Sequence, residues 1–456
     1  MTMTTISTAE RERFTLPLAR RRLLAERGVI DADRYRSELI DYVRRLDPQF
    51  RAFADWRPAD LEGSDVPYGC TVSYKDTIDV AGFPTRLGIR SGYRSYPDES
   101  AAIARRLSAS GLVCVGKAAV TECALGTERP SLNPVHPELS ASGSSTGSAV
   151  SVAAGFCDVS VGTDSGGSIR WPAVYCGATA LRMTPRARWL AGVHAVSPSL
   201  ESVGLVTRTP ADLAHLWRTY RLGTALGATS SLRRGLLRIG VAAPPGERLD
   251  TEVAAALAMV ADGLAARGHA LSHPDLGWAW GRRAEAWELL SREAYDGFGP
   301  LLDEDRTPLA ADTRRAIETG ARTSDERYAE LRQLQQEISG RMAALLTDDI
   351  DLLAIPLETG LPDWADRQYA SVVPTQQPDA VDLSLTIMAS HARLPVLALP
   401  VAQSSDGRPI GLQLLARPGA EDLLISAAEL VSALGQLRAS WNTRGDAVLI
   451  PERLRT

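Results

Sequence analysis

Lysine is almost absent from this sequence. Of its 50 basic residues only Lys75 and Lys117 are lysines, and all the others are arginines. An arginine stays protonated throughout the working pH range, whereas a lysine amine can be driven to neutrality and can then act as a base. A GC-rich genome would explain the abundance of arginine, but it would not explain where the two lysines stand. We therefore treat both lysines as candidates for chemistry that arginine cannot perform.

Cysteine is also scarce. The 456 residues include five cysteines, an odd number, and no two of them form a CxxC pair. This usage excludes a disulfide-stapled secreted scaffold and a zinc-binding spacing, and it is typical of buried, reduced thiols. We expect no disulfide, no metal and no cofactor. The five residues are Cys70, Cys114, Cys123, Cys157 and Cys176.

Basic clusters and long apolar runs are missing as well. The net charge of -5 and the pI near 5.8 come from charges of both signs spread along the chain. No basic stripe is available for nucleic acid, and no polybasic segment for a membrane surface. The first residues carry charges where a signal peptide needs apolar residues, and no apolar run approaches the roughly 18 residues of a membrane span. We expect a cytoplasmic protein that binds neither nucleic acid nor a membrane.

The hydrophobic pattern predicts an α/β chain. Apolar residues at helical spacing indicate two amphipathic helices over 8–46, whereas short apolar runs alternate with helix-compatible stretches from 66 to 206. We also expect helices over 211–222, 249–267 and 419–434, strands over 237–243, 351–356, 395–402 and 410–416, and a helical insertion over 279–347. Without a repeat or a long linker, we expect one domain over 1–456. It would comprise an N-terminal helical layer (1–60), a core with the catalytic residues (61–220) and the insertion beside the substrate pocket.

Serine and glycine are concentrated in two segments, ASGSSTGS at 141–148 and VGTDSGGSIRWPA at 161–173. Glycines let the backbone approach a ligand and let successive N–H groups point into one concavity, as a tetrahedral oxyanion requires. Serines supply nucleophilic and relay hydroxyls. The two segments therefore predict a site for acyl transfer.

A serine nucleophile needs a base, and no histidine is a good candidate. None of the six histidines lies in a recognisable triad context, and no GxSxG elbow precedes a helix. Lys75, in TVSYKDTIDV, follows a short apolar strand, where burial would lower the pKa of its amine. Neutrality near pH 7 needs a pKa about 3 units below the roughly 10.4 of a free lysine. Lys75 is therefore the candidate base.

These motifs occur in the order found in a known family. The segments are YGCTVSYKDTIDVAGFPT, GLVCVGKAAVTECALG, SGSSTGSAVSVAAG, VGTDSGGSIRWPAVYCG, DLLAIP and LPVLALPVAQSSDGRPIGLQLLA. They extend over nearly the whole chain, and Ser144 and Ser168 are 24 residues apart. The chain therefore resembles the amidase signature enzymes, which use a Ser, cis-Ser, Lys triad. The resemblance implies a large mixed β-sheet covered by helices on both faces.

The resemblance also implies roles for individual residues. Ser168 resembles the nucleophile, Ser144 the relay serine that follows a cis peptide bond after Gly143, and Lys75 the base. Neutral Lys75 would take the proton of Ser144, Ser144 would take that of Ser168, and Ser168 would attack the amide carbonyl. The oxyanion hole would consist of the backbone N–H groups of Ser165, Gly166, Gly167 and Ser168.

Several neighbouring residues have two interpretations. Ser145 would either bond the relay serine or cap a helix, and Arg170 would either clamp a substrate carboxylate or pair with Asp164. Lys117 matches a family lysine, but it also fits a structural ion pair with a carboxylate such as Glu122. The residues that we expect near the substrate are Thr127, Ser145, Arg170 and His391. The tryptophans that would either line an aromatic acyl pocket or pack in the core are Trp278, Trp280 and Trp287.

The leading functional prediction is hydrolysis of the C–N bond of a small non-peptide or terminal amide through an acyl-enzyme on Ser168. The same triad would also serve an amide-forming acyltransferase, in which an amine replaces water, or the glutaminase subunit of a tRNA-dependent amidotransferase. Thr146 stands where the family usually has Gly, and Arg182 with Met183 where Lys-Pro is common. These departures predict a specialised substrate range. The expected partner is a small-molecule amide, and the sequence leaves a homodimer open.

Overall fold

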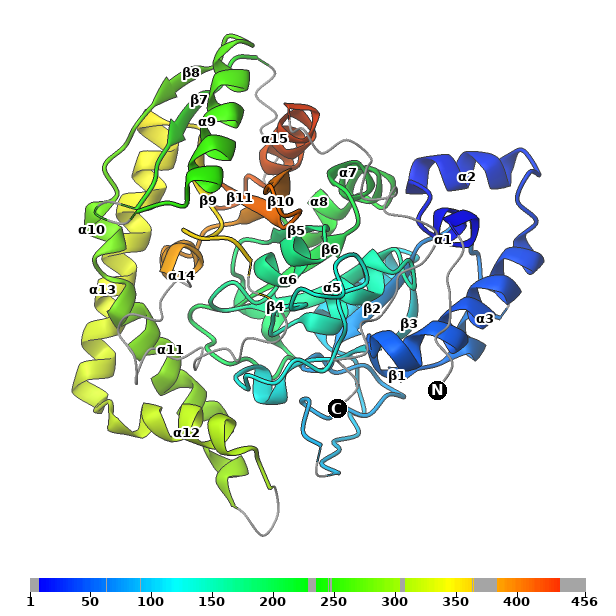
Figure 1. The fold of residues 1–456 in the computed structure, drawn as a ribbon. Coiled ribbons are helices and arrows are strands. Elements are labelled where there is room, and N and C mark those ends of the chain that lie inside the picture. Colours follow the sequence, from blue (N-terminus) through cyan, green and yellow to red (C-terminus); the bar gives the residue numbers. More distant parts are fainter. Residues whose placement is uncertain are drawn as a thin grey trace.

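A mixed sheet of eleven strands forms the centre of the molecule (Figure 1). The computed structural model describes residues 8–62, 64–90, 92–228, 235–244, 246, 248–303, 308–362, 364 and 384–434. The first seven residues of the expected N-terminal layer and residues 304–307 of the expected insertion lie outside these ranges. The strands are β1 (Phe53–Trp56), β2 (Thr71–Lys75), β3 (Val113–Ala118), β4 (Val159–Asp164), β5 (Thr179–Arg182), β6 (Ser202–Thr207), β7 (Arg238–Val241), β8 (Ala270–Ser272), β9 (Leu352–Pro356), β10 (Val396–Gln403) and β11 (Pro409–Leu415).

The strand order confirms the predicted mixed sheet. The order is β1-β3-β2-β4-β6-β5-β10-β11-β9-β7-β8. β2 runs parallel to β3 and β4, and β7 runs parallel to β8 and β9, whereas the other neighbours are antiparallel. The four strands predicted in the second half of the sequence correspond to β7, β9, β10 and β11.

Helices cover both faces of this sheet. They are α1 (Thr8–Phe14), α2 (Leu18–Glu26), α3 (Ala32–Phe50), α4 (Ala102–Ala109), α5 (Thr146–Ala153), α6 (Arg170–Tyr175), α7 (Pro210–Thr219), α8 (Leu222–Leu226), α9 (Thr251–Ala265), α10 (Gly277–Trp280), α11 (Arg283–Phe298), α12 (Ala311–Thr319), α13 (Asp325–Ala344), α14 (Ser384–His391) and α15 (Glu421–Leu434). One apolar cluster joins β2, β4 and β6 to α4, α7, α9 and α15, and a second contains α3, α5 and α6. The predicted cover of helices on both faces is confirmed.

The N-terminal part contains three helices where two were expected. Pro17 precedes α2, and proline fits the start of a helix because it has no N–H to donate. Asp31 caps α3, since its carboxylate accepts a hydrogen bond from the backbone N–H of Arg34 at 2.8 Å. These two residues divide a segment that the apolar pattern alone describes as more continuous.

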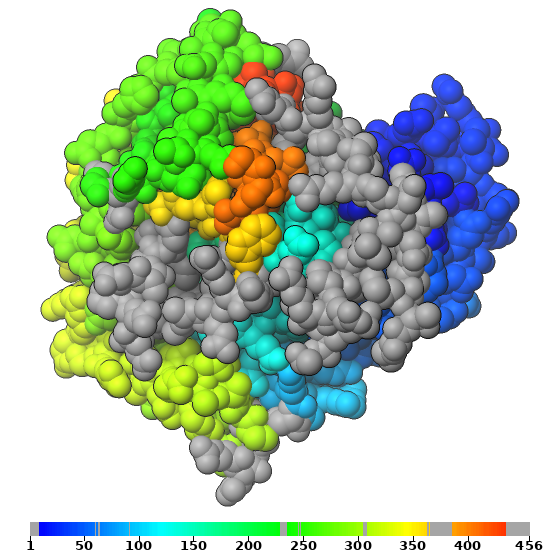
Figure 2. Space-filling view, in the orientation of Figure 1, coloured from blue at the N-terminus to red at the C-terminus, as the bar shows by residue number. Residues whose placement is uncertain are grey.

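The helical segments lie at opposite ends of the molecule. Figure 1 places α1 to α3, in blue, at one end and α11 to α13, in green to yellow, at the other. Figure 2 shows the same separation on the surface. The stretch predicted as a helical insertion is indeed helical and corresponds to α10 through α13. Even α13, with 20 residues, is not apolar enough to cross a membrane, and this holds for every helix among the described residues.

Three strand ends bring the Ser/Gly segments to one edge of the sheet. Lys75 ends β2 and Asp164 ends β4, and because these strands are parallel their carboxyl ends lie side by side. β6 is antiparallel to β4 and pairs Ser202 with Asp164, so Glu201, just before β6, lies at the same edge. The loop 165–168 leaves β4 at this edge and enters α6.

Candidate active site

The Lys75 side chain lies fully buried at the end of β2. Its Nζ lies 2.8 Å from Ser144 Oγ, in the loop before α5. Two further oxygen atoms, both from Thr163 on β4, lie at 3.0 Å (Oγ1) and 3.4 Å (backbone O). The structure thus brings two of the predicted catalytic residues, Lys75 and Ser144, into direct contact.

Burial decides the protonation of this amine. It lowers the pKa of Lys75 from 10.5 to about 8, although the carboxylates of Glu201 and Asp164 oppose the shift. The polar atoms that contact Nζ are hydroxyl and carbonyl oxygens, which stabilise an ammonium less than a carboxylate would. A substantial fraction of Lys75 is therefore neutral at mildly alkaline pH, as a base requires.

Ser144 follows a cis peptide bond to Gly143, as the resemblance implies. A side chain at Gly143 would crowd its neighbours, because a Cβ there would lie 3.1 Å from Thr121 Cγ2 and 3.2 Å from Arg129 Nη1. The backbone N–H of Thr121 donates to the Ser144 carbonyl at 3.2 Å. These contacts fix the hydroxyl of Ser144 between Lys75 and the cavity.

Ser168 stands at the end of the loop between β4 and α6. It is half-buried, whereas its neighbours in this loop are buried. The backbone N–H of Ser145 donates to the Ser168 carbonyl at 3.0 Å, which ties the loop to the N-terminus of α5. Ser168, Ser144 and Lys75 all line one cavity.

The predicted oxyanion loop departs from expectation at Gly167. The backbone N–H of Gly167 donates to Asp164 Oδ1 at 2.8 Å, so it is already engaged by a buried carboxylate. Gly167 has φ +123°, and a Cβ there would lie 2.6 Å from Thr386 Oγ1, so only glycine fits. Among the described residues, no acceptor is found for the N–H groups of Ser165, Gly166 and Ser168. These three amides remain candidates to bind an oxyanion.

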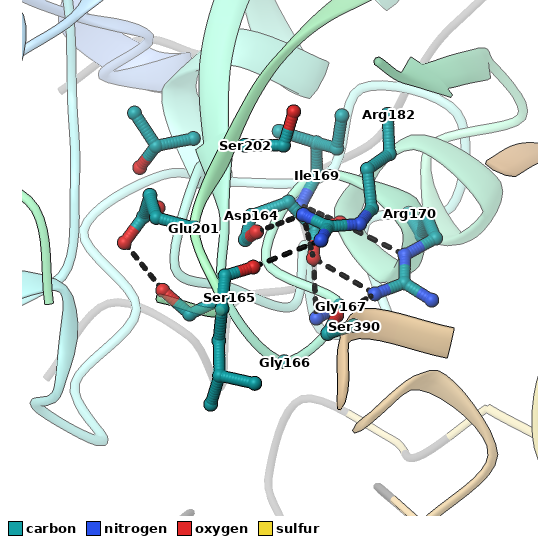
Figure 3. Close-up of polar contacts among 12 residues, drawn as sticks. Asp164, Ser165, Gly166, Gly167, Ile169, Arg170, Arg182, Glu201, Ser202 and Ser390 are labelled. Carbon is teal, nitrogen blue, oxygen red and sulfur yellow. Dashed lines mark hydrogen bonds and ion pairs between the residues drawn. The ribbon is translucent and has the colours of Figure 1, made fainter. Parts of the chain in front are cut away.

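A buried charge cluster supports this loop (Figure 3). Arg170 donates to both carboxylate oxygens of Asp164, at 2.8 and 2.9 Å, and Arg182 donates to the Asp164 carbonyl. Burial alone would raise the pKa of Asp164, but the two guanidinium charges outweigh it and hold that pKa at about 2. The predicted ion pair between Arg170 and Asp164 is therefore present. Arg170 is fully buried and does not line the cavity.

Glu201 is a cavity residue that the sequence analysis did not identify. Its carboxylate accepts the hydroxyl of Ser165 and the backbone N–H of Val196 at 3.0 Å (Figure 3). It is 1% exposed. The position just before an apolar strand was the available signal, because strand ends are where α/β folds place functional side chains.

The cavity wall is mostly apolar outside the Ser/Gly loops. Its lining residues are Lys75, Thr121, Ala124, Leu125, Gly126, Arg129, Ser142, Gly143, Ser144, Ser165, Gly166, Gly167, Ser168, Trp171, Val196, Glu201, Trp287 and Leu290. Trp287 packs against the oxyanion loop, since a Cβ on Gly166 would lie 3.0 Å from its ring. Trp278 and Trp280 are not among the lining residues. The acyl-pocket interpretation therefore suits Trp287 alone.

The other residues expected near the substrate lie behind this wall. Thr127 donates through its N–H and hydroxyl to Asp312, at 2.8 and 2.5 Å. The Ser145 hydroxyl donates to the Thr163 carbonyl at 3.3 Å and does not cap α5. His391 is buried, and burial lowers its pKa to about 4. Their substrate contacts remain predictions that these positions do not support.

Lys117 has a carboxylate partner, but not the expected one. Its Nζ lies 3.1 Å from Asp76 Oδ1, and both side chains are fully buried. Glu122 instead accepts the backbone N–H of Ala310 at 2.9 Å. Within the described part of the chain, no group of three or more His, Cys, Asp or Glu side chains is placed to hold a metal ion.

Comparisons with known proteins agree with this geometry. The family model Amidase matches residues 34–425. A subunit of glutamyl-tRNA(Gln) amidotransferase from Synechococcus sp. (strain WH7803) is 30% identical over 442 residues, which cover 86% of this chain and 88% of that protein. Indoleacetamide hydrolase from Pseudomonas syringae pv. syringae is 40% identical over 195 residues, 41% of this chain and 43% of that protein.

The fold also matches solved structures. The structure of 6-aminohexanoate cyclic dimer hydrolase superposes with a TM-score of 0.79 at 23% identity and covers 93% of this chain and 97% of that one. A structure titled as that of an amidase gives the same TM-score at 24% identity, covering 92% of this chain and 100% of that one. With a family model that matches most of its length, this chain belongs to the amidase family, enzymes that cleave amide C–N bonds.

Proposed function

We propose that the protein hydrolyses the C–N bond of a small non-peptide or terminal amide through an acyl-enzyme on Ser168. The observation that carries this proposal is the buried contact between Lys75 Nζ and Ser144 Oγ, at 2.8 Å, on the wall of a cavity that also contains Ser168. A hydroxyl held by a partly neutral amine is a proton relay. Ser168 is the one member of the set with substantial exposure to that cavity.

Counting hydrogen-bond donors supports the neutral form of Lys75. A neutral amine has two N–H donors and one lone pair. The two donors match the two oxygens of Thr163, and the lone pair accepts the hydroxyl proton of Ser144. Ser144 in turn accepts the proton of Ser168 as Ser168 attacks the carbonyl carbon.

Each later step returns that proton. In the tetrahedral intermediate, the oxyanion would accept hydrogen bonds from the N–H groups of Ser165, Gly166 and Ser168. The relay then gives its proton to the amide nitrogen, the C–N bond breaks and the amine leaves. Water attacks the acyl-enzyme in the same way and releases the acid.

The cavity wall favours an apolar acyl group. Trp171, Trp287, Val196 and Leu290 face it, and aromatic rings in such a wall stack well on a planar acyl group. The similarity to indoleacetamide hydrolase, whose name denotes an aromatic acyl group, points the same way. Primary amides of aryl-substituted acids are therefore the substrates to test first.

The experiment is a panel of primary amides that differ in their acyl group, followed by mass spectrometry of the trapped enzyme. We expect an acyl adduct on Ser168, with aryl acids preferred over short alkyl acids. Unchanged turnover in Ser168→Ala would contradict the proposed nucleophile, and failure to cleave any amide would contradict the proposed function.

The amidotransferase alternative has one observation in its favour, the 30% identity to a subunit of glutamyl-tRNA(Gln) amidotransferase over most of both chains. Glutamine cleavage that appears only with a copurified partner would support it. The acyltransferase alternative predicts that an added amine captures the acyl group. Acid as the sole product at every amine concentration would exclude that alternative.

A further inference from the structure

The pair formed by Lys117 and Asp76 is a buried charged group that the mechanism above does not use. The two side chains lie 3.1 Å apart, and neither is exposed. Isolated buried charges are strongly unfavourable, whereas a pair largely cancels its own field. Asp76 directly follows Lys75 in the sequence, so this pair sits one residue from the proposed base.

We propose that the ion pair between Asp76 and Lys117 positions Lys75 and balances the electric field at its amine. The inference rests on the proposed role of Lys75 as the base. Lys75 pairs with Ala118, and Tyr74 with Lys117, on the parallel strands β2 and β3. Because side chains alternate along a strand, Lys75 and Lys117 project to opposite faces. Asp76, the next residue, points toward Lys117.

Asp76 is held from several directions. Its backbone N–H donates to the Ala118 carbonyl at 2.9 Å, and its carbonyl accepts from the Leu87 N–H at 3.3 Å. Its second carboxylate oxygen accepts from the Arg86 N–H at 3.1 Å. With Lys117 on the first oxygen, the residue after Lys75 cannot shift without breaking four interactions. The main chain of Lys75 is therefore fixed at the point where its side chain reaches Ser144.

The site around Lys117 also explains why it is not an arginine. Its Nζ lies within 3.5 Å of three oxygen atoms, namely Asp76 Oδ1, Thr85 Oγ1 at 2.9 Å and the Pro84 carbonyl at 3.5 Å. An ammonium has three N–H donors, so donors and acceptors match. A guanidinium has five donors in a wider planar fork, and two of them would be buried without partners.

Other charged groups around both lysines are fixed by their own partners. Lys75 faces the carboxylates of Glu201 and Asp164, which lie on the cavity side. The ion pair is faced by Asp79, Cys114 and Arg86. Asp79 accepts the Thr85 hydroxyl and pairs with His194 at 3.1 Å, whereas Arg86 pairs with Asp55 at 2.9 Å. Removal of one member of the central pair therefore leaves an uncompensated charge close to Lys75.

The scarcity of lysine allows a direct test. Labelling with [13Cε]lysine places the isotope at only two sites, and Lys117→Met removes one of the two signals, which assigns the other to Lys75. The change of its chemical shift with pH gives the protonation midpoint of Lys75 without any substrate. This readout would not respond to a purely structural role.

The inference predicts shifts of opposite sign. Lys117→Met leaves the Asp76 carboxylate alone and should raise the midpoint of Lys75, whereas Asp76→Asn leaves the Lys117 ammonium alone and should lower it. Each shift should be on the order of one pH unit for a single charge at this range. The double variant removes both charges and should return the midpoint to within about half a unit of the wild-type value.

A second buried ion pair on the same strand is the matched control. Arg21 and Asp158 lie 2.5 Å apart, and Asp158 accepts the N–H of Thr71, at the start of β2. Asp158→Asn should disturb that end of the strand but leave the midpoint of Lys75 unchanged. If Lys117→Met does not fold, Asp76→Asn and the double variant still give the test.

The result that would overturn the inference is an unmoved midpoint in folded Asp76→Asn, or shifts of the same sign in both single variants. These outcomes are separate from a failure of the proposed function. If the midpoints move as expected but no acyl adduct forms on Ser168, the proposed function is wrong and the electrostatic coupling stands. If the adduct forms and the midpoints do not move, the reverse holds.

Discussion

The surroundings of Lys75 and Lys117 contain the only two lysines of the chain and treat them in opposite ways. Both side chains are fully buried at the ends of adjacent parallel strands. Nζ of Lys75 contacts hydroxyl and carbonyl oxygens, whereas Nζ of Lys117 contacts a carboxylate as well. Burial lowers the pKa of both, but for Lys117 the charge of Asp76 opposes that shift at close range. The difference shows that the partner, and not burial, distinguishes a base from a structural cation.

Replacement of Lys75 should have the largest effect on activity. Lys75→Met removes the proton acceptor, and we expect kcat/KM to fall by at least about 1,000-fold. Lys75→Arg should be equally inactive, because a guanidinium remains protonated. Lys117→Met should still form the acyl-enzyme once the pH is raised. A tenth or more of wild-type activity in Lys75→Arg would contradict the role of Lys75 as a base.

The two Lys→Met variants should change stability in opposite directions. Lys117→Met leaves Asp76 buried without its cation and should lower the free energy of unfolding by about 3 to 5 kcal/mol. Lys75→Met removes an ammonium that burial disfavours, as shown by a pKa lowered from 10.5 to about 8. At about 1.36 kcal/mol per unit it should raise that free energy by up to about 3 kcal/mol, less the lost hydrogen bonds.

This gain should depend on pH in a defined window. The folded pKa of Lys75 lies below its unfolded value, so the penalty is complete below pH 8 and disappears as the pH rises from 8 to 10.5. Wild type should therefore gain stability relative to Lys75→Met across that window. Urea unfolding of both proteins at several pH values measures the difference. A stability difference that is constant with pH would contradict the lowered pKa.

Local patterns were enough to predict most of the fold and the centre of the site. Short apolar runs predicted β7, β9, β10 and β11, because the strands of a covered sheet are apolar on both faces. The Ser/Gly segments predicted a loop with free N–H groups. The structure brings Ser144 into contact with Lys75 and places Ser168 on the same cavity.

The remaining details depend on side-chain direction, which local patterns do not carry. Asp76, next to the candidate base, was not considered as a partner for Lys117, because the pairing depends on the register of β2 against β3. The inward turn of the Gly167 N–H depends on the position of Asp164 after folding. Glu201 reaches the cavity only because β6 is antiparallel to β4.

Neutralising Glu201 should have an intermediate effect that sharpens the comparison from the side of Lys75. The Glu201 carboxylate opposes the burial effect on the pKa of Lys75, so Glu201→Gln should lower that pKa further. The acid limb of the kcat/KM profile should then move to lower pH by about one unit. Glutamine keeps an oxygen that accepts the Ser165 hydroxyl.

Glu293→Gln is the matched control for this variant. Glu293 is also buried, and it accepts the Ser197 hydroxyl and the Ser199 N–H, at 2.6 and 2.9 Å, in the loop that leads to Glu201. It does not line the cavity. Its removal should leave the acid limb in place. Equal shifts in both variants would mean that loop disorder, and not charge at the cavity, moves the limb.

The smallest effect should come from Ser145, the hydroxyl nearest in sequence to the relay serine. Its side chain makes only a 3.3 Å contact to the Thr163 carbonyl, which Lys75 also approaches. Its backbone N–H holds the Ser168 carbonyl and survives substitution. Ser145→Ala should therefore lower kcat/KM by less than about fivefold and stability by about 1 kcal/mol, whereas Ser144→Ala should lower kcat/KM by at least about 100-fold. Similar losses in the two variants would show that Lys75 acts through a wider hydroxyl network than the single contact to Ser144.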